Sequence, residues 1–362
     1  MAALIKNKSN VSDITRDLPS LQFENALTDE ERGYLVLRAR CHAINVSLCA
    51  QAAYFIAILN DARKEILELR NPKLTKSSKF LQDSQERNPV KIGILGCGRL
   101  GSHLVNTLFT YADVEPEDLK ISTRRPETLG ELQEKGVHCF HDNASLASSV
   151  HVLFLCVLPS QLPGVAEEIR GKISSHCTVY SFVSAVPIPR LRQILKTSHI
   201  IKPDITWKVD NVEKDWPTDS DINGTLENPN NVDITCPLSF NKEDAVINTS
   251  EKLLEMMIYS FVNMCTVLGL TKSETVTIAN SVILGVQKAR ESPVKMKVHY
   301  FTRKRSETAL DTQPFPKFDM GTVAANETPL TRVITKNEEI RKMIIKKYKT
   351  TFDKFHYLKG MR

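Results

Sequence analysis

The chain has 362 residues, of which 41% are hydrophobic and 25% charged; it is long enough for two domains, and this composition excludes a largely disordered chain. Its net charge of +6 is unevenly distributed, because residues 288–362 hold 18 Lys and Arg against 8 Asp and Glu and carry +10, whereas residues 1–287 carry −4. A basic surface over the whole molecule, as in many nucleic-acid-binding proteins, is therefore not expected.

The first predicted element is a long helix. Thr28 and Glu31 have the spacing of a capping box, and apolar residues then recur at helical spacing as far as about Arg70. The stretch 41–59 is apolar but contains several polar side chains, so we expect a buried helix and not a membrane span. We interpret residues 1–88 as an N-terminal helical extension followed by a charged linker.

The cysteines and the first residues bear on the compartment. Eight cysteines lie in apolar contexts without a C-x-x-C pair, which is typical of free thiols in a reducing environment. Residues 1–20 lack the apolar segment of a secretory signal, and Asp13 and Asp17 argue against a transit peptide. We expect a cytoplasmic protein, with a mitochondrial location less favoured. No cluster of His, Cys, Asp and Glu has metal-ligand spacing, so no metal site is predicted.

Residues 89–204 alternate short strands with helices. The predicted helices are 102–111, 127–135 and 144–149, and the predicted strands are 90–95, 119–123, 137–140, 150–157, 178–184 and 199–201. Continuous apolar strands alternating with helices indicate a parallel sheet buried on both faces. The sequence therefore predicts an α/β fold with a Rossmann-type, doubly wound parallel sheet.

Residues 205–292 are predicted to contain a long loop and then helices. The loop covers 205–241, which is rich in Asp, Asn and Thr, and two long helices follow at 243–268 and 272–289. Together these predict an all-α second domain.

Residues 293–362 form the basic C-terminal arm, expected to be irregular until a last helix at about 336–355. The arm could attract nucleic acid or an acidic partner. Its aromatic side chains are too sparse for base stacking, so a solvated helix face and a flexible arm are favoured over a nucleic-acid-binding module.

A G-x-G-x-x-G sequence follows the first predicted strand and opens the next helix, which is the context of a dinucleotide-binding turn. Its first glycine allows a tight turn, the second lets a pyrophosphate approach the backbone, and the third lets the helix pack closely on the sheet. The alternative is a glycine-rich turn without a ligand. The predicted cofactor-binding residues of the turn are Gly96, Cys97, Gly98, Arg99, Leu100 and Gly101. Cys97 could be activated by the helix N-terminus, but a small loop residue is the favoured interpretation.

The end of the second strand indicates which dinucleotide is bound. Sites for NAD place Asp or Glu there for the ribose 2′-hydroxyl. This chain instead has Ser122, Thr123, Arg124 and Arg125, whose hydroxyl and guanidinium groups could bind and neutralise a 2′-phosphate. NADP is therefore predicted over NAD. The alternative is that the two arginines lie on a solvated turn.

Four segments resemble the pyrroline-5-carboxylate reductase family. The four segments are 96–101, 122–126, 152–159 and 178–186. The resemblance as a whole covers residues 90–204. It is weaker over 261–289, where the family has paired dimerisation helices. It implies NADP binding, a small-molecule imine or carbonyl substrate, and a homo-oligomer with an all-α dimerisation-like domain.

The resemblance also implies which loops border the nicotinamide. These are the loops after the fourth and fifth strands, with Val157, Leu158 and Pro159 in the first and Ser184 in the second. The family's substrate motifs are changed: Leu158 replaces a lysine, 202–204 read Lys-Pro-Asp in place of Met-Pro-Asn, and the glycine-serine-proline helix start is replaced at 249–254. By position, the candidate catalytic residues are Ser184, Lys202 and Asp204.

These features predict an NADP(H)-dependent oxidoreductase that transfers hydride to or from a C=N or C=O carbon. The loss of the substrate motifs keeps a second hypothesis open, a non-catalytic NADP(H)-binding sensor or scaffold. Membrane partners are not expected, and nucleic-acid partners are disfavoured.

Overall fold

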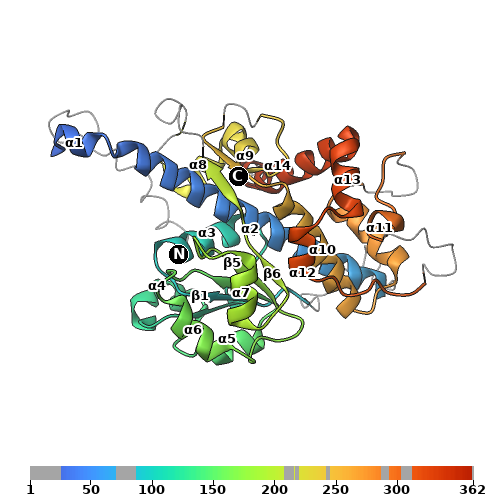
Figure 1. The fold of residues 1–362 in the computed structure, drawn as a ribbon, viewed down its shortest axis with the longest axis horizontal. Coiled ribbons are helices and arrows are strands. Elements are labelled where there is room, and N and C mark those ends of the chain that lie inside the picture. Colours follow the sequence, from blue (N-terminus) through green and yellow to red (C-terminus); the bar gives the residue numbers. More distant parts are fainter. Residues whose placement is uncertain are drawn as a thin grey trace.

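The computed structural model describes a parallel sheet with its helices and a larger helical part beside it (Figure 1). Residues 26–70, 87–207, 216, 220–241, 245–286, 293–302 and 312–360 are described. The predicted boundaries at 88, 204 and 292 stay predictions.

Six parallel strands form the main sheet in the order β3-β2-β1-β4-β5-β6. They are β1 (Ile92–Leu95), β2 (Leu119–Ser122), β3 (His138–Phe140), β4 (Val152–Leu155), β5 (Thr178–Ser181) and β6 (Ile200–Ile201). β1 is central and its Ile92 pairs with Leu119 of β2 and Val152 of β4. This order is that of the doubly wound dinucleotide-binding fold, so the predicted fold class is confirmed.

Helices cover both faces of this sheet because its strands are apolar on both. The segments between strands are α3 (Arg99–Tyr111), η4 (Pro116–Asp118), η5 (Pro126–Leu129), α4 (Gly130–Glu134), α5 (Asn143–Ser149), α6 (Leu162–Ile169) and α7 (Ile188–Leu195). α5, α6 and α7 pack in a row over side chains such as Leu153 and Val179. α3 lies on the opposite face, over side chains such as Ile94 and Phe154.

The N-terminal helix lies at the centre of the molecule. After the short α1 (Asp29–Arg32), whose predicted capping box is present, α2 (Leu35–Arg70) runs along α3 and also contacts the C-terminal helices (Figure 1). By length and hydropathy, 29–70 contains a window that could span a membrane, but 83% of that window is buried inside the fold. The prediction of a buried helix is confirmed.

The region after the sheet contains more regular structure than predicted. β7 (Ile205–Trp207) pairs antiparallel with β8 (Ile247–Thr249), and between them lie α8 (Ile222–Leu226) and α9 (Pro229–Thr235). The predicted loop at 205–241 is thus wrong. α8 and α9 begin at side-chain caps from Asp221 and Asn228, which explains why this polar segment still forms helices.

The two long helices that follow are shorter than predicted. α10 (Lys252–Val267) starts late because β8 occupies part of the expected helix. α11 (Lys272–Val282) begins at a capping box between Thr271 and Glu274, and a left-handed Gly285 (φ +70°) follows its end.

The basic C-terminal arm is folded over most of its described length. It contains η6 (Val298–Tyr300), α12 (Met320–Ala325), α13 (Pro329–Lys336) and α14 (Glu338–Gly360), so the irregular stretch predicted before residue 336 is wrong. Tyr348 and Phe352 of α14 are buried, and the Tyr348 ring lies 4.8 Å from that of Tyr54 in α2. A flexible arm is therefore also wrong for this segment; Arg303, Lys304 and Arg305 lie outside the described residues.

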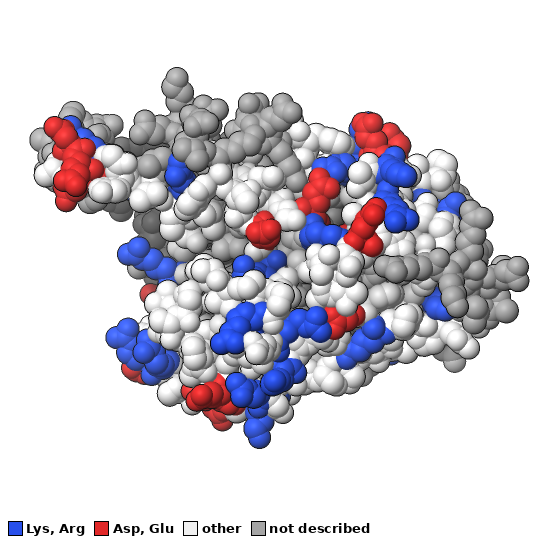
Figure 2. Space-filling model, in the orientation of Figure 1, with Lys and Arg blue, Asp and Glu red and all other residues white. Residues whose placement is uncertain are grey.

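Charges of both signs alternate over α13 and α14 on the face drawn in Figure 2. Several basic side chains of the arm pair with carboxylates, as in Lys342–Glu338, at 2.8 Å, and Arg341–Glu251, at 2.6 Å. The net positive charge of the arm is thus partly neutralised within the fold.

Candidate cofactor site and active site

The glycine turn joins β1 to α3 with its backbone tightly packed. Gly96 adopts a left-handed φ of +89°, and its N–H donates to the carbonyl of Ser122 in β2, at 2.9 Å. A Cβ on Gly101 would lie 2.5 Å from the carbonyl oxygen of Gly96, whereas one on Gly98 would meet no atom within 4 Å. The first and third glycines therefore serve packing, and the second leaves open space above the turn.

That open space faces the N-terminus of α3. Gly98 is the N-cap and provides no side-chain cap, and the first turn of the helix contains no acidic residue. The first amides of a helix lack partners within it and carry a partial positive charge. Together with Gly98, they form a cradle that fits a pyrophosphate.

The end of β2 separates buried from exposed groups. Ser122 is 1% exposed, and its hydroxyl donates to Oδ1 of Asn143, at 2.7 Å, and accepts from the N–H of Asp142. The predicted contact of its hydroxyl with a cofactor is thus corrected to an internal, structural role. Arg124 and Arg125 are exposed and Thr123 is half-buried, so these three residues remain available for a 2′-phosphate.

Cys97 packs inside the turn. Burial raises the pKa of its thiol, and its Sγ lies 3.6 Å from Oγ of Ser102. A raised pKa is opposite to what an activated thiolate needs, which supports the interpretation as a small packing residue. All eight cysteines are free, as predicted.

The loops after β4 and β5 reach the same edge of the sheet as the turn. Val157 packs against Gly96: its Cγ1 would lie 2.9 Å from a Cβ at that position. Leu158 and Pro159 are exposed, as is Ser184 in the next loop. Parallel strands end at one edge, so the loop after β4 borders the glycine turn and the loop after β5 lies at the same edge of the sheet; their contact with a nicotinamide stays a prediction.

Lys202 and Asp204 follow β6, beside the loop that carries Ser184. Lys202 is half-buried and Asp204 is exposed, while the Asp204 carbonyl accepts from the N–H of Ser250, at 2.9 Å, and so fixes the start of β7. The three candidate catalytic residues therefore lie after the adjacent strands β5 and β6.

Comparison with known proteins identifies the family. Residues 91–183 match the family described as NADP oxidoreductase, coenzyme F420-dependent. The chain is 33% identical over 329 residues to the mouse NADP-dependent oxidoreductase domain-containing protein 1, covering 89% of each chain. The chain belongs to the family of NADP-dependent oxidoreductase domain-containing protein 1.

More distant relatives agree with the family resemblance. Pyrroline-5-carboxylate reductase 3 of Danio rerio is 26% identical over 130 residues, 36% of this chain and 45% of that protein. A solved pyrroline-5-carboxylate reductase from Coxiella burnetii aligns with 75% of this chain and 99% of its own at 16% identity, with a TM-score of 0.30. The sequence relatives confirm the predicted resemblance to pyrroline-5-carboxylate reductases.

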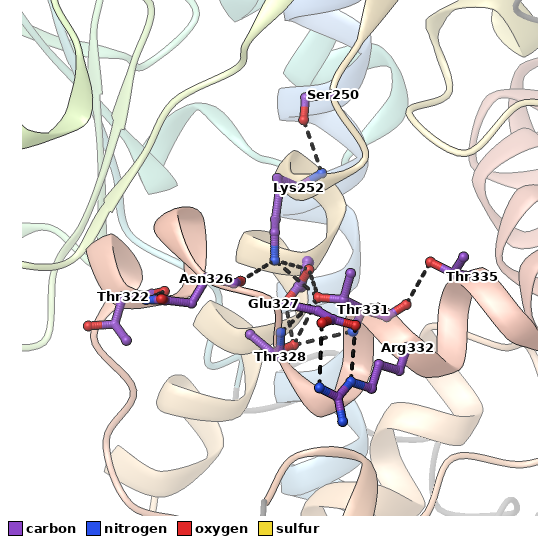
Figure 3. Close-up of polar contacts among 10 residues, drawn as sticks. Ser250, Lys252, Thr322, Asn326, Glu327, Thr328, Thr331, Arg332 and Thr335 are labelled. Atoms are coloured by element: carbon purple, nitrogen blue, oxygen red, sulfur yellow. Dashed lines mark hydrogen bonds and ion pairs between the residues drawn. The ribbon is translucent and has the colours of Figure 1, made fainter.

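In this member of the NADP-dependent oxidoreductase domain-containing family, α10 begins with a lysine whose ammonium group is fully engaged. Lys252 Nζ donates to Oε2 of the buried Glu255, at 2.7 Å, to the carbonyl of Asn326 and to the hydroxyl of Thr331 (Figure 3). Glu255 also accepts from the hydroxyls of Thr328 and Thr331. These contacts fasten α13 to α10 and leave the Lys252 ammonium no further N–H to donate.

The sequence did not indicate that α2 carries a half-buried histidine bonded to residues far along the chain. His42 of α2 accepts at Nδ1 from Nε1 of Trp216, at 2.9 Å, and its Nε2 lies 3.0 Å from the carbonyl of Ser220. Burial lowers the pKa of His42, the hydrogen bond with the Ser220 carbonyl partly opposes this, and the nearby His103 of α3 adds to the lowering. These contacts of His42 depend on how α2 packs in the folded protein, which the periodicity of the sequence does not reveal.

Proposed function

We propose that this chain binds NADP(H) across the β1–α3 turn and the end of β2. The observation that carries the proposal is the pair of exposed arginines, Arg124 and Arg125, which follow β2 where an NAD site would present a carboxylate. Guanidinium groups can neutralise a 2′-phosphate, and the open space at Gly98 accommodates the pyrophosphate. The family's name and the dinucleotide-binding strand order support the same cofactor.

We further propose an oxidoreductase acting on a C=N or C=O carbon of a small molecule. When bound, NADP(H) supplies or accepts the hydride. The protein's own part is to hold the substrate over the edge formed by the loops after β4, β5 and β6. The Ser184 hydroxyl can donate a hydrogen bond to the reacting nitrogen or oxygen, and the Lys202 ammonium can stabilise negative charge on an adjacent carboxylate or carbonyl oxygen. Asp204 can accept a hydrogen bond from the substrate.

The second candidate function is a non-catalytic NADP(H)-binding sensor or scaffold. The start of α10 favours it, because the altered segment there places Lys252 in contacts with Glu255 and Thr331. A residue engaged in this way fastens helices together and does not bind substrate. A homo-oligomeric state and a cytoplasmic location stay predictions.

A fluorescence titration with NADPH and NADH tests the cofactor. We expect tighter binding of NADPH, with the preference lost in an Arg124→Ala/Arg125→Ala variant and kept in Arg332→Ala, an exposed arginine on α13. Equal affinity for the two cofactors, or unchanged NADPH binding in the double variant, would overturn the proposal.

A screen of cyclic imines and 2-oxo acids, followed by NADPH absorbance, separates the two candidate functions. Turnover that disappears in Gly98→Leu, where the new side chain fills the cradle, establishes the oxidoreductase. NADPH binding without turnover of any substrate in the screen favours the sensor or scaffold.

A further inference from the structure

A second cavity lies at the edge of the sheet opposite the cofactor site. Its volume is about 330 Å³, near the lower end of the roughly 300–1,000 Å³ typical of ligand pockets. His151, Thr178 and His199, at the amino ends of β4, β5 and β6, line it together with Arg63 of α2 and Lys317. Because the strands are parallel, these amino ends lie a strand's length away from the glycine turn.

The lining of this cavity is rich in hydrogen-bond donors. Five basic side chains contribute to it, and several hydroxyls accompany them, whereas no Asp or Glu among the described residues does. The basic residues are Arg63, His151, His176, His199 and Lys317. A donor-rich wall without a carboxylate is the composition of an anion site.

Arg63 supplies a buried cation that the fold only partly satisfies. It is 7% exposed, and its Nη1 donates to Oδ1 of Asn88, at 2.8 Å, and to the carbonyl of Pro89, at 3.1 Å. Its Nε has no hydrogen-bond partner. That nitrogen is enclosed by the protein, and no carboxylate among the described residues pairs with Arg63, so its guanidinium contributes an uncompensated positive charge to this wall.

The tautomer of His151 adds a second donor. Its Nδ1 accepts from the N–H of Lys91, at 2.9 Å, which places the proton of the neutral ring on Nε2. Burial, with Arg63 and Lys91 nearby, lowers the pKa of His151 to about 4, so the ring is a neutral N–H donor at physiological pH.

The opposite wall also presents hydrogen-bond donors, from His199 and Lys317. Burial lowers the pKa of His199 and of Lys317, and Lys317 and His176 lower that of His199 further. Asp319 acts on His199 in the other direction, but it lies outside the lining and forms an ion pair with Arg192, at 2.9 Å. Lys317 Nζ donates to the carbonyl of Ser175, which leaves two of its N–H bonds for a ligand.

We infer that this cavity is a second binding site, which takes the phosphate group of a small metabolite or a free phosphate ion. Donors reach it from α2, from the starts of β4 and β6, and from the segment before α12. A tetrahedral phosphate can accept from several directions at once, whereas the two oxygens of a carboxylate lie in one plane. The bound phosphate would connect α2, the sheet and the C-terminal part.

Isothermal titration of the full-length protein tests this site at constant ionic strength in chloride. All titrations use an Arg124→Ala/Arg125→Ala/Gly98→Leu background, which removes the two arginines and fills the pyrophosphate cradle, so that phosphate binding at the cofactor site does not contribute. The probes are inorganic phosphate, methyl phosphate and malonate. We expect one phosphate per chain, with methyl phosphate binding as well if the natural ligand is a monoester, and with malonate bound more weakly.

Lys317→Met and His199→Leu should each weaken phosphate binding about tenfold, since each removes one hydrogen bond to a charged group. Lys346→Met, which removes an exposed charge on α14, should leave it unchanged. Lys317 is largely exposed, so its variant is expected to fold even if His199→Leu does not. Equal phosphate affinity in the background protein and Lys317→Met, or binding of malonate without phosphate, would overturn the inference.

Discussion

The carbonyl oxygen of Gly96 occupies the space that a side chain on Gly101 would need. The Cβ of an alanine there would lie 2.5 Å from that oxygen, well inside van der Waals contact. The first turn of α3 can therefore approach the end of β1 only while residue 101 is glycine.

Gly101→Ala should lower the free energy of unfolding by roughly 1–3 kcal/mol, the usual cost of overpacking. It should also weaken NADPH binding, because α3 must shift away from the turn. Urea denaturation measures the stability. Gly98→Ala is the matched control, since its Cβ meets no atom within 4 Å; if both variants lost equal stability, the close approach would not be the cause.

Ser122→Ala should destabilise the fold without changing the cofactor preference. Its buried hydroxyl bonds Asn143 and Asp142, and removing it leaves Oδ1 of Asn143 without this donor, at a cost of roughly 1–3 kcal/mol. Thr123→Ala should show the reverse pattern, a small loss of stability and weaker NADPH binding. Thermal denaturation and cofactor titration of both variants check the assignment, and weaker NADPH binding in stable Ser122→Ala would contradict it.

Lys252→Met should cost about 3 kcal/mol or more, because it removes the cation beside a carboxylate that is 2% exposed. Lys342→Met removes a partner of Glu338 in a solvent-screened surface pair and should cost far less stability than Lys252→Met. Urea unfolding of both proteins measures the difference. A Lys252→Met/Glu255→Gln variant should recover part of the loss, and equal stability of the two lysine variants would rule out a structural role for the buried pair.

Stability should fall as the pH drops from about 6.5 to 4, partly because of His151. Its pKa in the folded protein is lowered to about 4, so over this range the unfolded chain binds a proton that the folded protein does not. His151→Asn keeps an acceptor for the Lys91 N–H and does not titrate, so its plot of unfolding free energy against pH should be flatter there. His138→Asn, at an exposed position, is the control, and an unchanged slope in His151→Asn would refute the assignment.

The part of the fold nearest the candidate cofactor site could be predicted because its signals are local. An apolar strand, three spaced glycines and a helix follow one another within about twenty residues, and each restricts the next. The pairing of β7 with β8 joins segments some forty residues apart across a polar stretch, and no periodicity marks it. α12 and α13 are too short for a helical repeat to stand out, and their caps at Asp319 and Thr328 were the available signal.

The residues of the candidate site also fall into those that local sequence indicated and those that depend on tertiary contacts. The exposure of Arg124 and Arg125 follows from their place after a strand, and that place was visible in the sequence. The burial of Ser122 depends on Asn143 of α5, which is a tertiary contact. The second cavity gathers side chains from separate strands and from α2, so no single stretch of sequence indicated it.

The central position of α2 has a consequence for how the protein is made. α2 is synthesised well before α14, yet part of its apolar surface is covered by that helix. The ring of Tyr54 in α2 lies against the ring of Tyr348 in α14. Until α14 has been synthesised, α2 lacks part of its cover, although its side chains from Cys49 to Leu59 are all buried in the folded protein. Such exposure favours aggregation. We therefore expect ribosome-bound intermediates of this protein to depend on a chaperone until α14 has emerged.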